Sequence, residues 1–564
     1  MLYFFSPTIL EVLPREGGEA FKRKKERTIK REEVNPMKRR LILLCLFAVV
    51  LLLTPSMAQI PKDVLVIGMS HEPIIDFEPA RVYEFEGGFV LEQTYDQLVN
   101  FVGGKEAFER IEPGLAESWE VSADGLSWTF HLRKGVKFHS GNEVNADAVV
   151  FSLRRSLALN QPPIWILKQF VPEPEMIQKV DDYTVKITTN QPLGEMLMAA
   201  VLGYQGITSI VDPAVVEAHA TPDDPYATKW LAEHDAGSGP YILKEWIRRD
   251  RIVLEAFPDY WRGEPPIKQI IIKDIPEPTA QKLALEKGDI DIAWNLLPEM
   301  IADLRGKAGI KVIETPSWYF HYAAMNLGYE PFSNVKVRQA VRWAIDYEAI
   351  TEGIMAGAAV KCHTFVPIGM FGHLDLLYHQ DLEKAKQLMK EAGYEKGFEV
   401  EMLTRTDPPY PDIAAQIKED LKKINIEVKV KAMIYAELLK IYRAQQHQMV
   451  LVRWGADYAD PSAQAAPFAH CRTPGPEAEV RQLAWRNMYC PSGVTDWVEQ
   501  AAGERDMRKR EILYKAIQGV VLEEGPYIML HNPLIQVATR DIVQGLQVPP
   551  MWYYTELFAV SKSK

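Results

Sequence analysis

Apolar and polar residues follow two periods over residues 59–564, one typical of strands and one of helices. Apolar residues recur at helical spacing over 381–392, and Gly393 suits the position just after a helix. A second helix is predicted at 413–424, directly after a Pro-Asp pair, and a strand follows it at once. Helices that alternate with strands favour an α/β fold. The segments predicted to be strands are 64–67, 127–132, 251–257 and 426–430.

Length, composition and charge narrow the class of protein. The chain has 564 residues, more than one hydrophobic core usually supports, so two or three lobes are expected. Hydrophobic residues make up 47% and charged residues 25%, which is typical of a globular protein. The net charge is −12, and residues 1–58 hold 11 Lys and Arg against 6 Asp and Glu, so the following residues carry −17. Phosphate contacts need clustered Lys and Arg, so we expect no nucleic-acid partner.

The N-terminal region has the pattern of a secretory signal peptide over residues 37–58. A basic cluster at 38–40 precedes an apolar run at 41–53, and a small-x-small triplet follows at 56–58. The apolar run is too short to span a bilayer as a helix, which needs about 20 residues. We therefore expect cleavage after Ala58, with an uncleaved signal anchor as the alternative.

Two further features bear on the start of the chain and on its compartment. Met37 directly precedes the basic cluster, so residues 1–36 are interpreted as an upstream extension. Cys45 follows Leu44, where a lipidated cysteine needs a small residue, so no lipobox is predicted. Together these features predict a soluble protein exported to the periplasm, without a lipid anchor.

No catalytic, metal-binding or cofactor-binding motif is found in the sequence. The Gly-Gly-Lys at 103–105 lacks the other residues of a phosphate loop, and the His-Glu at 71–72 is followed by proline. The Gly-Ser-Gly at 237–239 lacks the spacing of a nucleophile elbow. We therefore expect no catalytic residues, no metal and no cofactor. An exported hydrolase stays open as an alternative, because many active sites have no local signature.

Several blocks spread along the chain resemble one known family, the family 5 extracellular solute-binding proteins of ABC transporters, which includes dipeptide- and oligopeptide-binding proteins. The resemblance extends from about residue 64 to about residue 560. Its blocks are PGLAESW (113–119) with DGLSWTFHLRKGVKF (124–138), GPYILKEW (239–246), LEKGDIDIA (285–293), NVKVRQAVRWAID (334–346), 381–397 and WGADYADP (454–461).

The resemblance implies an α/β, two-lobed periplasmic-binding-protein fold of the large, peptide-binding type, with a cleft between the lobes. Two hinge crossings are expected, near 318–326 and near 528–536. Lobe I would comprise 59–320 and 535–564, and lobe II would be the insertion 321–534. Ligand binding in the cleft would favour closure by a hinge motion.

The resemblance also implies a function. The protein would be the exported substrate-binding component of an ABC importer, a monomer that captures a solute and delivers it to the permease subunits in the membrane. A short peptide is the favoured ligand. Tryptophans in the blocks near the cleft keep an oligosaccharide open as the alternative, since indole rings stack on sugar faces.

Four residues are candidates for ligand contact. Asp457 matches the aspartate that receives the α-ammonium group in the peptide binders, and a charge-assisted hydrogen bond suits that task. Its alternative role is to organise the loop. Trp454 and Tyr458 flank it in the same block. Arg405 is the arginine nearest to the position where the dipeptide binder holds the peptide carboxylate, although Pro408 aligns closer to that position.

Three cysteines follow the predicted cleavage site, and an oxidising compartment permits a disulfide. The resemblance implies a bridge between Cys471 and Cys490, because the dipeptide-binding relatives carry a bridged pair after the same block. Cys362 is then the odd one, expected to be a buried or half-buried thiol.

Overall fold

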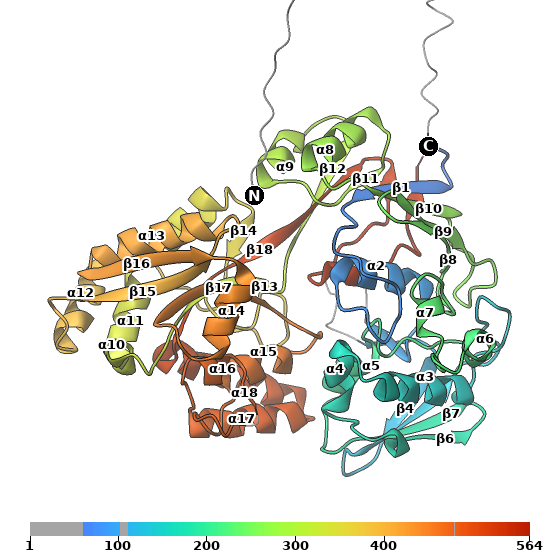
Figure 1. Ribbon diagram of the computed structural model, residues 1–564, viewed down its shortest axis with the longest axis horizontal. Coiled ribbons are helices and arrows are strands. Elements are labelled where there is room, and N and C mark those ends of the chain that lie inside the picture. The colour runs from blue at the N-terminus through green and yellow to red at the C-terminus, as the bar shows by residue number, and fades with distance from the viewer. Residues whose placement is uncertain (1–59, 102–110, 479, 564) are drawn as a thin grey trace, which may run out of the picture. The chain divides into compact units, whose positions relative to one another are not determined.

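The computed structural model describes residues 60–101, 111–478 and 480–563. The predicted extension and signal peptide lie outside the described residues. Residues 59–564 form one compact unit, whose main feature is a twelve-stranded sheet (Figure 1). We name β1 and β8–β12 the N-terminal strand group and β13–β17 the C-terminal strand group. Both groups share β18.

The order of ten strands runs across the sheet without a break, and β12 and β14 pair with β18 beside that path. In sheet order the strands are β16 (Ile426–Met433), β15 (Phe398–Arg405), β17 (Met449–Gly455), β13 (Tyr319–Met325), β18 (Tyr527–Arg540), β11 (Ile292–Ala293), β1 (Val64–Met69), β10 (Gln269–Asp274), β9 (Arg251–Ala256) and β8 (Tyr241–Ile247), with β12 (Ile310–Pro316) and β14 (Ala359–Lys361) at the side.

The strand β18 joins the two strand groups, as its course in Figure 1 shows. Its first part pairs antiparallel with β13, from Tyr527 to His531. Its second part pairs antiparallel with β12, from Leu534 to Arg540. Because only two residues separate β12 from β13, the chain passes between the groups once there and once within β18.

Helices cover the C-terminal strand group. The α13 helix buries its apolar face against β15 and β16, as the periodicity predicts. The helices of this part are α10 (Glu330–Ser333), α11 (Val335–Ala344), α12 (Leu382–Glu391), α13 (Tyr410–Lys422), α14 (Tyr435–Arg443), α15 (Ser462–Ala469), α16 (Leu483–Arg486), α17 (Ser492–Gly503) and α18 (Met507–Glu524).

The predicted elements are confirmed with small changes at their ends. The helix α12 ends at Glu391, and Gly393 follows with a φ of +81°, which glycine adopts without strain. The helix α13 begins at Tyr410, earlier than predicted, because Pro411 fits the first turn, where no backbone N–H is needed. All four predicted strands are present, as β1, β5, β9 and β16.

The N-terminal part contains a second, four-stranded sheet, in which alternate residues of β5 such as Trp128 and Phe130 are buried. Its strands are β4 (Ala116–Val121), β5 (Ser127–Leu132), β7 (Thr184–Thr188) and β6 (Ile177–Asp181). Two strand pairs complete the sheets: β2 (Val99–Phe101) with β3 (Ile111–Pro113), and β19 (Val543–Gln544) with β20 (Ser561–Lys562). The helices are α2 (Phe85–Thr94), α3 (Ala146–Leu159), α4 (Trp165–Lys168), α5 (Glu195–Leu202), α6 (Pro213–His219), α7 (Thr228–Leu231), α8 (Pro278–Lys287) and α9 (Pro298–Leu304).

The position of α2 is fixed by a close approach of another loop. A Cβ atom at Gly237 would collide with the carbonyl oxygen of Thr94, the last residue of α2, and a Cβ atom at Gly239 would also crowd this turn. The absence of these side chains lets the loop cross the end of the helix. The opposite end of α2 carries Phe85 and Glu86 into the cavity described below.

No helix within residues 60–101, 111–478 and 480–563 is both long enough and apolar enough to cross a membrane.

Candidate ligand-binding cleft

A cavity of about 480 Å³ lies beside the two passages of the chain between the strand groups. Its volume falls in the range typical of small-ligand sites, about 300–1,000 Å³. A larger groove, of about 910 Å³, lies along α12 among charged side chains, far in sequence from the passages. The residues that line the smaller cavity include Phe85, Glu86, Trp294, Tyr319, His321, Arg453, Pro533 and Trp552.

Asp457 lies just beyond the end of β17 and contacts the other side of the cleft. The hydroxyl of Tyr83, which precedes α2, donates a hydrogen bond of 2.8 Å to Oδ1 of Asp457. Burial raises the pKa of Asp457 to about 6, although the bond from Tyr83 works in the opposite direction. Within the part of the chain that the structure describes, no cation forms an ion pair with this carboxylate. A cationic ligand group would therefore stabilise it.

The loop that carries Asp457 is held by a buried ion pair. Oδ1 of Asp460 accepts the backbone N–H of Ser462 at 2.8 Å and a hydrogen bond from Nη2 of Arg510, also at 2.8 Å. Both charged side chains are fully buried. The Asp-Pro pair at 460–461 is typical of a turn, in keeping with the bond to Ser462, and sequence reasoning goes no further than that. It misses Arg510, because the partner is 50 positions away and no local pattern marks it.

Arg405 lies at the end of β15 and is not among the residues that line the cavity. Its guanidinium group donates two hydrogen bonds to Asp407, of 2.8 and 2.6 Å. The group also lies over the rings of Tyr410 and Tyr435, at 4.6 and 4.4 Å from their centroids. The structure therefore pairs Arg405 locally and does not bring it together with Asp457.

The side chains of Trp454 and Tyr458 pack against other residues of the protein and do not enter the cavity. Tyr458 is only 3% exposed, and its hydroxyl lies 3.1 Å from Oγ of Ser462, so its side chain belongs to the core. The ring of Trp454 packs edge-on against Phe468, with centroids 6.2 Å apart. Neither residue lines the cavity, and Asp457 is not among the lining residues either; of the four candidates it alone forms a hydrogen bond across to the segment that precedes α2. The lining residues that sequence reasoning missed include Glu86 and Arg453, and the side chain of Arg453 projects from the face of β17 opposite to that of its neighbour Trp454.

A comparison with known protein families shows to which family the chain belongs. Residues 110–475 match the family model of bacterial extracellular solute-binding proteins, family 5 (middle). The chain belongs to this family.

Other family members agree with this assignment over nearly their whole lengths. The probable D,D-dipeptide-binding periplasmic protein DdpA of Escherichia coli K12 is 30% identical, covering 88% of this chain and 93% of that protein. Heme-binding protein A of Haemophilus influenzae is 31% identical, covering 85% and 89%. Among solved structures, the periplasmic binding protein DppA of Helicobacter pylori in complex with the peptide STSA gives a TM-score of 0.71 at 27% identity, covering 89% and 98%.

These similarities confirm the predicted fold class, a two-lobed α/β binding protein, and the predicted family. The relatives are substrate-binding proteins of extracytoplasmic transport systems. In the described part of this family member, no group of three or more His, Cys, Asp or Glu side chains is placed to hold a metal ion.

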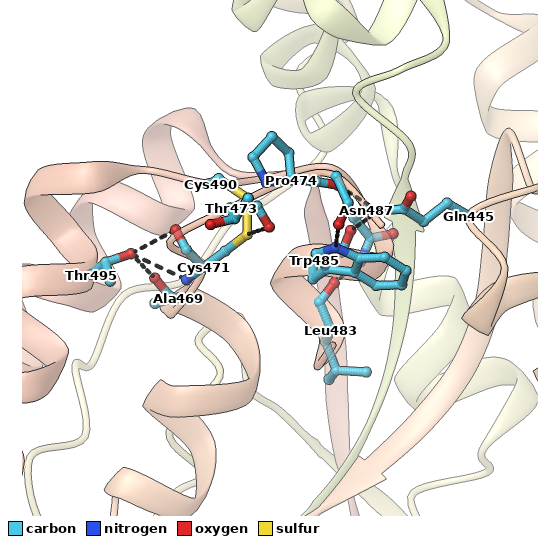
Figure 2. Close-up of a disulfide and its surroundings, with 11 residues drawn as sticks. Gln445, Ala469, Cys471, Thr473, Pro474, Leu483, Trp485, Asn487, Cys490 and Thr495 are labelled. Carbon is cyan, nitrogen blue, oxygen red and sulfur yellow. Dashed lines mark hydrogen bonds between the residues drawn. A yellow bond between two sulfur atoms is a disulfide. The ribbon is translucent and has the colours of Figure 1, made fainter. Parts of the chain in front are cut away.

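A disulfide joins Cys471 to Cys490 in the structure, the pair that the resemblance implies (Figure 2). The bridge closes the segment between α15 and α17, which contains α16. The backbone N–H of Cys471 donates to Oγ1 of Thr495 at 3.1 Å, and Nε1 of Trp485 donates to the carbonyl oxygen of Gly475 at 3.0 Å. The third cysteine, Cys362, is free and buried, and burial raises the pKa of its thiol to about 11.

We predict that replacing both Cys471 and Cys490 with serine lowers the free energy of unfolding by about 3 kcal/mol. The bridge joins residues 19 positions apart and so reduces the conformational entropy of the unfolded chain. Urea denaturation of the oxidised protein measures the change, and peptide mapping without reductant detects the bridge. A Cys362→Ser variant is the control, since it leaves the bridge in place. Equal urea midpoints with and without reductant would contradict the prediction.

Proposed function

We propose that this protein captures a short peptide with a free N-terminus in the cleft and delivers it to the permease of an ABC importer. Asp457 carries this proposal: it is a partly buried carboxylate with a raised pKa, it lies just beyond β17 and accepts a hydrogen bond from Tyr83 on the other side, and no described cation is paired with it. A ligand ammonium group would supply the missing charge through a charge-assisted hydrogen bond. The names of the relatives in Escherichia coli and Helicobacter pylori support a peptide ligand.

We further propose that lobe I comprises residues 59–320 and 535–564, and that lobe II comprises 321–534. The pairing of β18 with both strand groups supports this division, since the partner of β18 changes from β13 to β12 between His531 and Leu534. The lobes would close around the ligand by bending at these two passages. Closure would present the permease with a surface that the open form lacks.

An oligosaccharide is the second candidate ligand. The rings of Trp294 and Trp552 line the cavity with centroids 5.4 Å apart, and indole faces can stack on sugar rings. Against this candidate, Asp457 and Arg453 offer charges that a neutral sugar does not use.

Native mass spectrometry of protein purified without refolding tests the proposal by identifying a retained ligand. Calorimetry with di- to tetrapeptides and with cello- and manno-oligosaccharides then gives the affinities. We expect micromolar or tighter binding of peptides, no binding of the sugars and no hydrolysis of either. A protein that ignores peptides and binds a sugar, or one that cleaves its ligand, would overturn the proposal.

We predict that export removes residues up to Ala58, so that the mature protein begins at Gln59 within a residue or two and is a monomer. N-terminal sequencing of the periplasmic fraction and light scattering check these two points. The variant Ala58→Phe is the control, since a large residue at the cleavage site should block processing. Recovery of the wild-type chain on membranes with residues 38–58 intact would contradict the prediction.

A further inference from the structure

Two side chains of opposite charge line the cavity from the two sides of the cleft. Glu86 comes from the first turn of α2, and Arg453 comes from β17. Among the described residues, neither forms an ion pair or a side-chain hydrogen bond, and Arg453 is left with a contact to the ring of Tyr319, 5.8 Å from its centroid. Charges that line a cavity without partners are suited to a ligand that brings the complementary charges.

The direction of Arg453 follows from the pairing of its strand. Arg453 lies opposite His321 in the antiparallel pairing of β17 with β13, and Gly455 lies opposite Tyr319. A Cβ atom at Gly455 would collide with the Tyr319 ring, so glycine lets this ring lie across the strand. Since Trp454 packs into the core on one face of β17, its neighbour Arg453 projects from the other face into the cavity.

The environment of Glu86 favours a cation. Burial raises the pKa of Glu86, its own backbone N–H works against that rise, and the nearby Glu84 adds to it. Burial and the charge of Glu84 both disfavour the charged form of Glu86, and a ligand cation beside the carboxylate would stabilise that form. Tyr319 lines the same cavity as Glu86 and Arg453, and its ring is the contact that Arg453 makes.

We propose that the cavity is a charged subsite for the last residue of the ligand, with Arg453 binding a carboxylate and Glu86 binding a basic side chain. The ligand class is then a short peptide that ends in lysine or arginine with a free C-terminus. This inference rests on the proposed peptide capture, in which Asp457 holds the other end of the ligand. The selectivity would come from two charge-assisted bonds, one to the carboxylate and one to the side chain of the last residue.

Calorimetry on three tripeptides tests the subsite: Ala-Ala-Lys, Ala-Ala-Ala and Ala-Ala-Lys amide. We expect Ala-Ala-Lys to bind the wild type about tenfold or more tightly than either of the others. The variant Glu86→Gln should lose the preference for lysine over alanine and keep the preference for a free carboxylate. The variant Arg453→Gln should do the reverse, because each variant removes one bond.

Matched controls are Glu419→Gln on α13 and Arg508→Gln on α18, which are exposed and lie outside the cavity. Equal affinity for all three peptides, with both cavity variants unchanged, would overturn the subsite and leave peptide capture intact. Failure of every peptide to bind would overturn peptide capture itself. A third result would also overturn the subsite. If the two variants change the stability of the empty protein non-additively and leave the peptide affinities unchanged, Glu86 and Arg453 pair with each other and not with the ligand.

Discussion

Replacing Asp457 with asparagine should weaken peptide binding by roughly thirty- to several-thousand-fold. Asparagine keeps the shape of the side chain and can still accept the hydrogen bond from Tyr83, but it removes the charge. The ligand ammonium would then be desolvated in the closed cleft without compensation, at a cost of about 2–5 kcal/mol, and each 1.4 kcal/mol is about tenfold in affinity. Calorimetry with one peptide in its free and N-acetylated forms measures the effect.

Acetylation and the Asn substitution should be non-additive, since both remove the same interaction. Acetylation should therefore weaken binding to the wild type strongly and to Asp457→Asn far less. Additive losses would reduce Asp457 to a residue that organises the loop. The variant Asp407→Asn is a matched control, because that carboxylate is already paired with Arg405, whereas Asp457 has no described cationic partner.

The same interaction should depend on pH in a defined direction. The pKa of Asp457 is about 6 in the empty cleft, and an ammonium ligand binds the charged form. Affinity should fall above about pH 8, where the α-ammonium of the ligand loses its proton, be greatest near pH 7, and fall as the pH decreases through 6, approaching tenfold per pH unit at lower pH. The Asn variant should lack this component of the pH dependence.

Replacing Asp460 with asparagine should lower the free energy of unfolding by about 3–5 kcal/mol. The substitution keeps an acceptor for the N–H of Ser462 but leaves the guanidinium of Arg510 buried without a counter-ion. Removing one member of a buried ion pair is costly, because the remaining charge is far from water. Denaturation in urea, followed by circular dichroism, gives the loss.

Two further variants isolate the charge. The double variant Asp460→Asn with Arg510→Met should recover much of the stability, since no uncompensated charge remains. The variant Lys386→Met removes an exposed partner of Glu383 and should change stability by less than about 1 kcal/mol. A loss below about 1 kcal/mol for Asp460→Asn would show that the ion pair contributes little.

The sequence predicts local elements well where one period dominates. The helix α13 and the strand β16 are recognised because their apolar residues keep a single period over several turns or alternations. The sheet order could not be predicted from these patterns, because β11, β12 and β18 pair over hundreds of residues. Only the resemblance to a family indicated two crossings.

The candidate site shows the same limit. Asp457 was found through a motif, but its partner Tyr83 is 374 positions away, and no pattern in the sequence connects them. Arg405 was chosen for its charge, and that charge is already used by Asp407, two residues further on. Tyr458 was chosen for its place beside Asp457, but the loop turns its ring into the core. Direction and local pairing, which decide such cases, are properties of the folded chain.

The strand β18 also dictates when the sheet can be completed. In the described structure β12 pairs with no strand other than β18, although β12 ends at Pro316 and β18 begins at Tyr527. The strand β12 can therefore pair with β18 only after about two hundred further residues have been synthesised, and contacts over such sequence separations form slowly. Under the export proposed above, this delay favours translocation, because the twelve-stranded sheet stays incomplete until β18 has been synthesised.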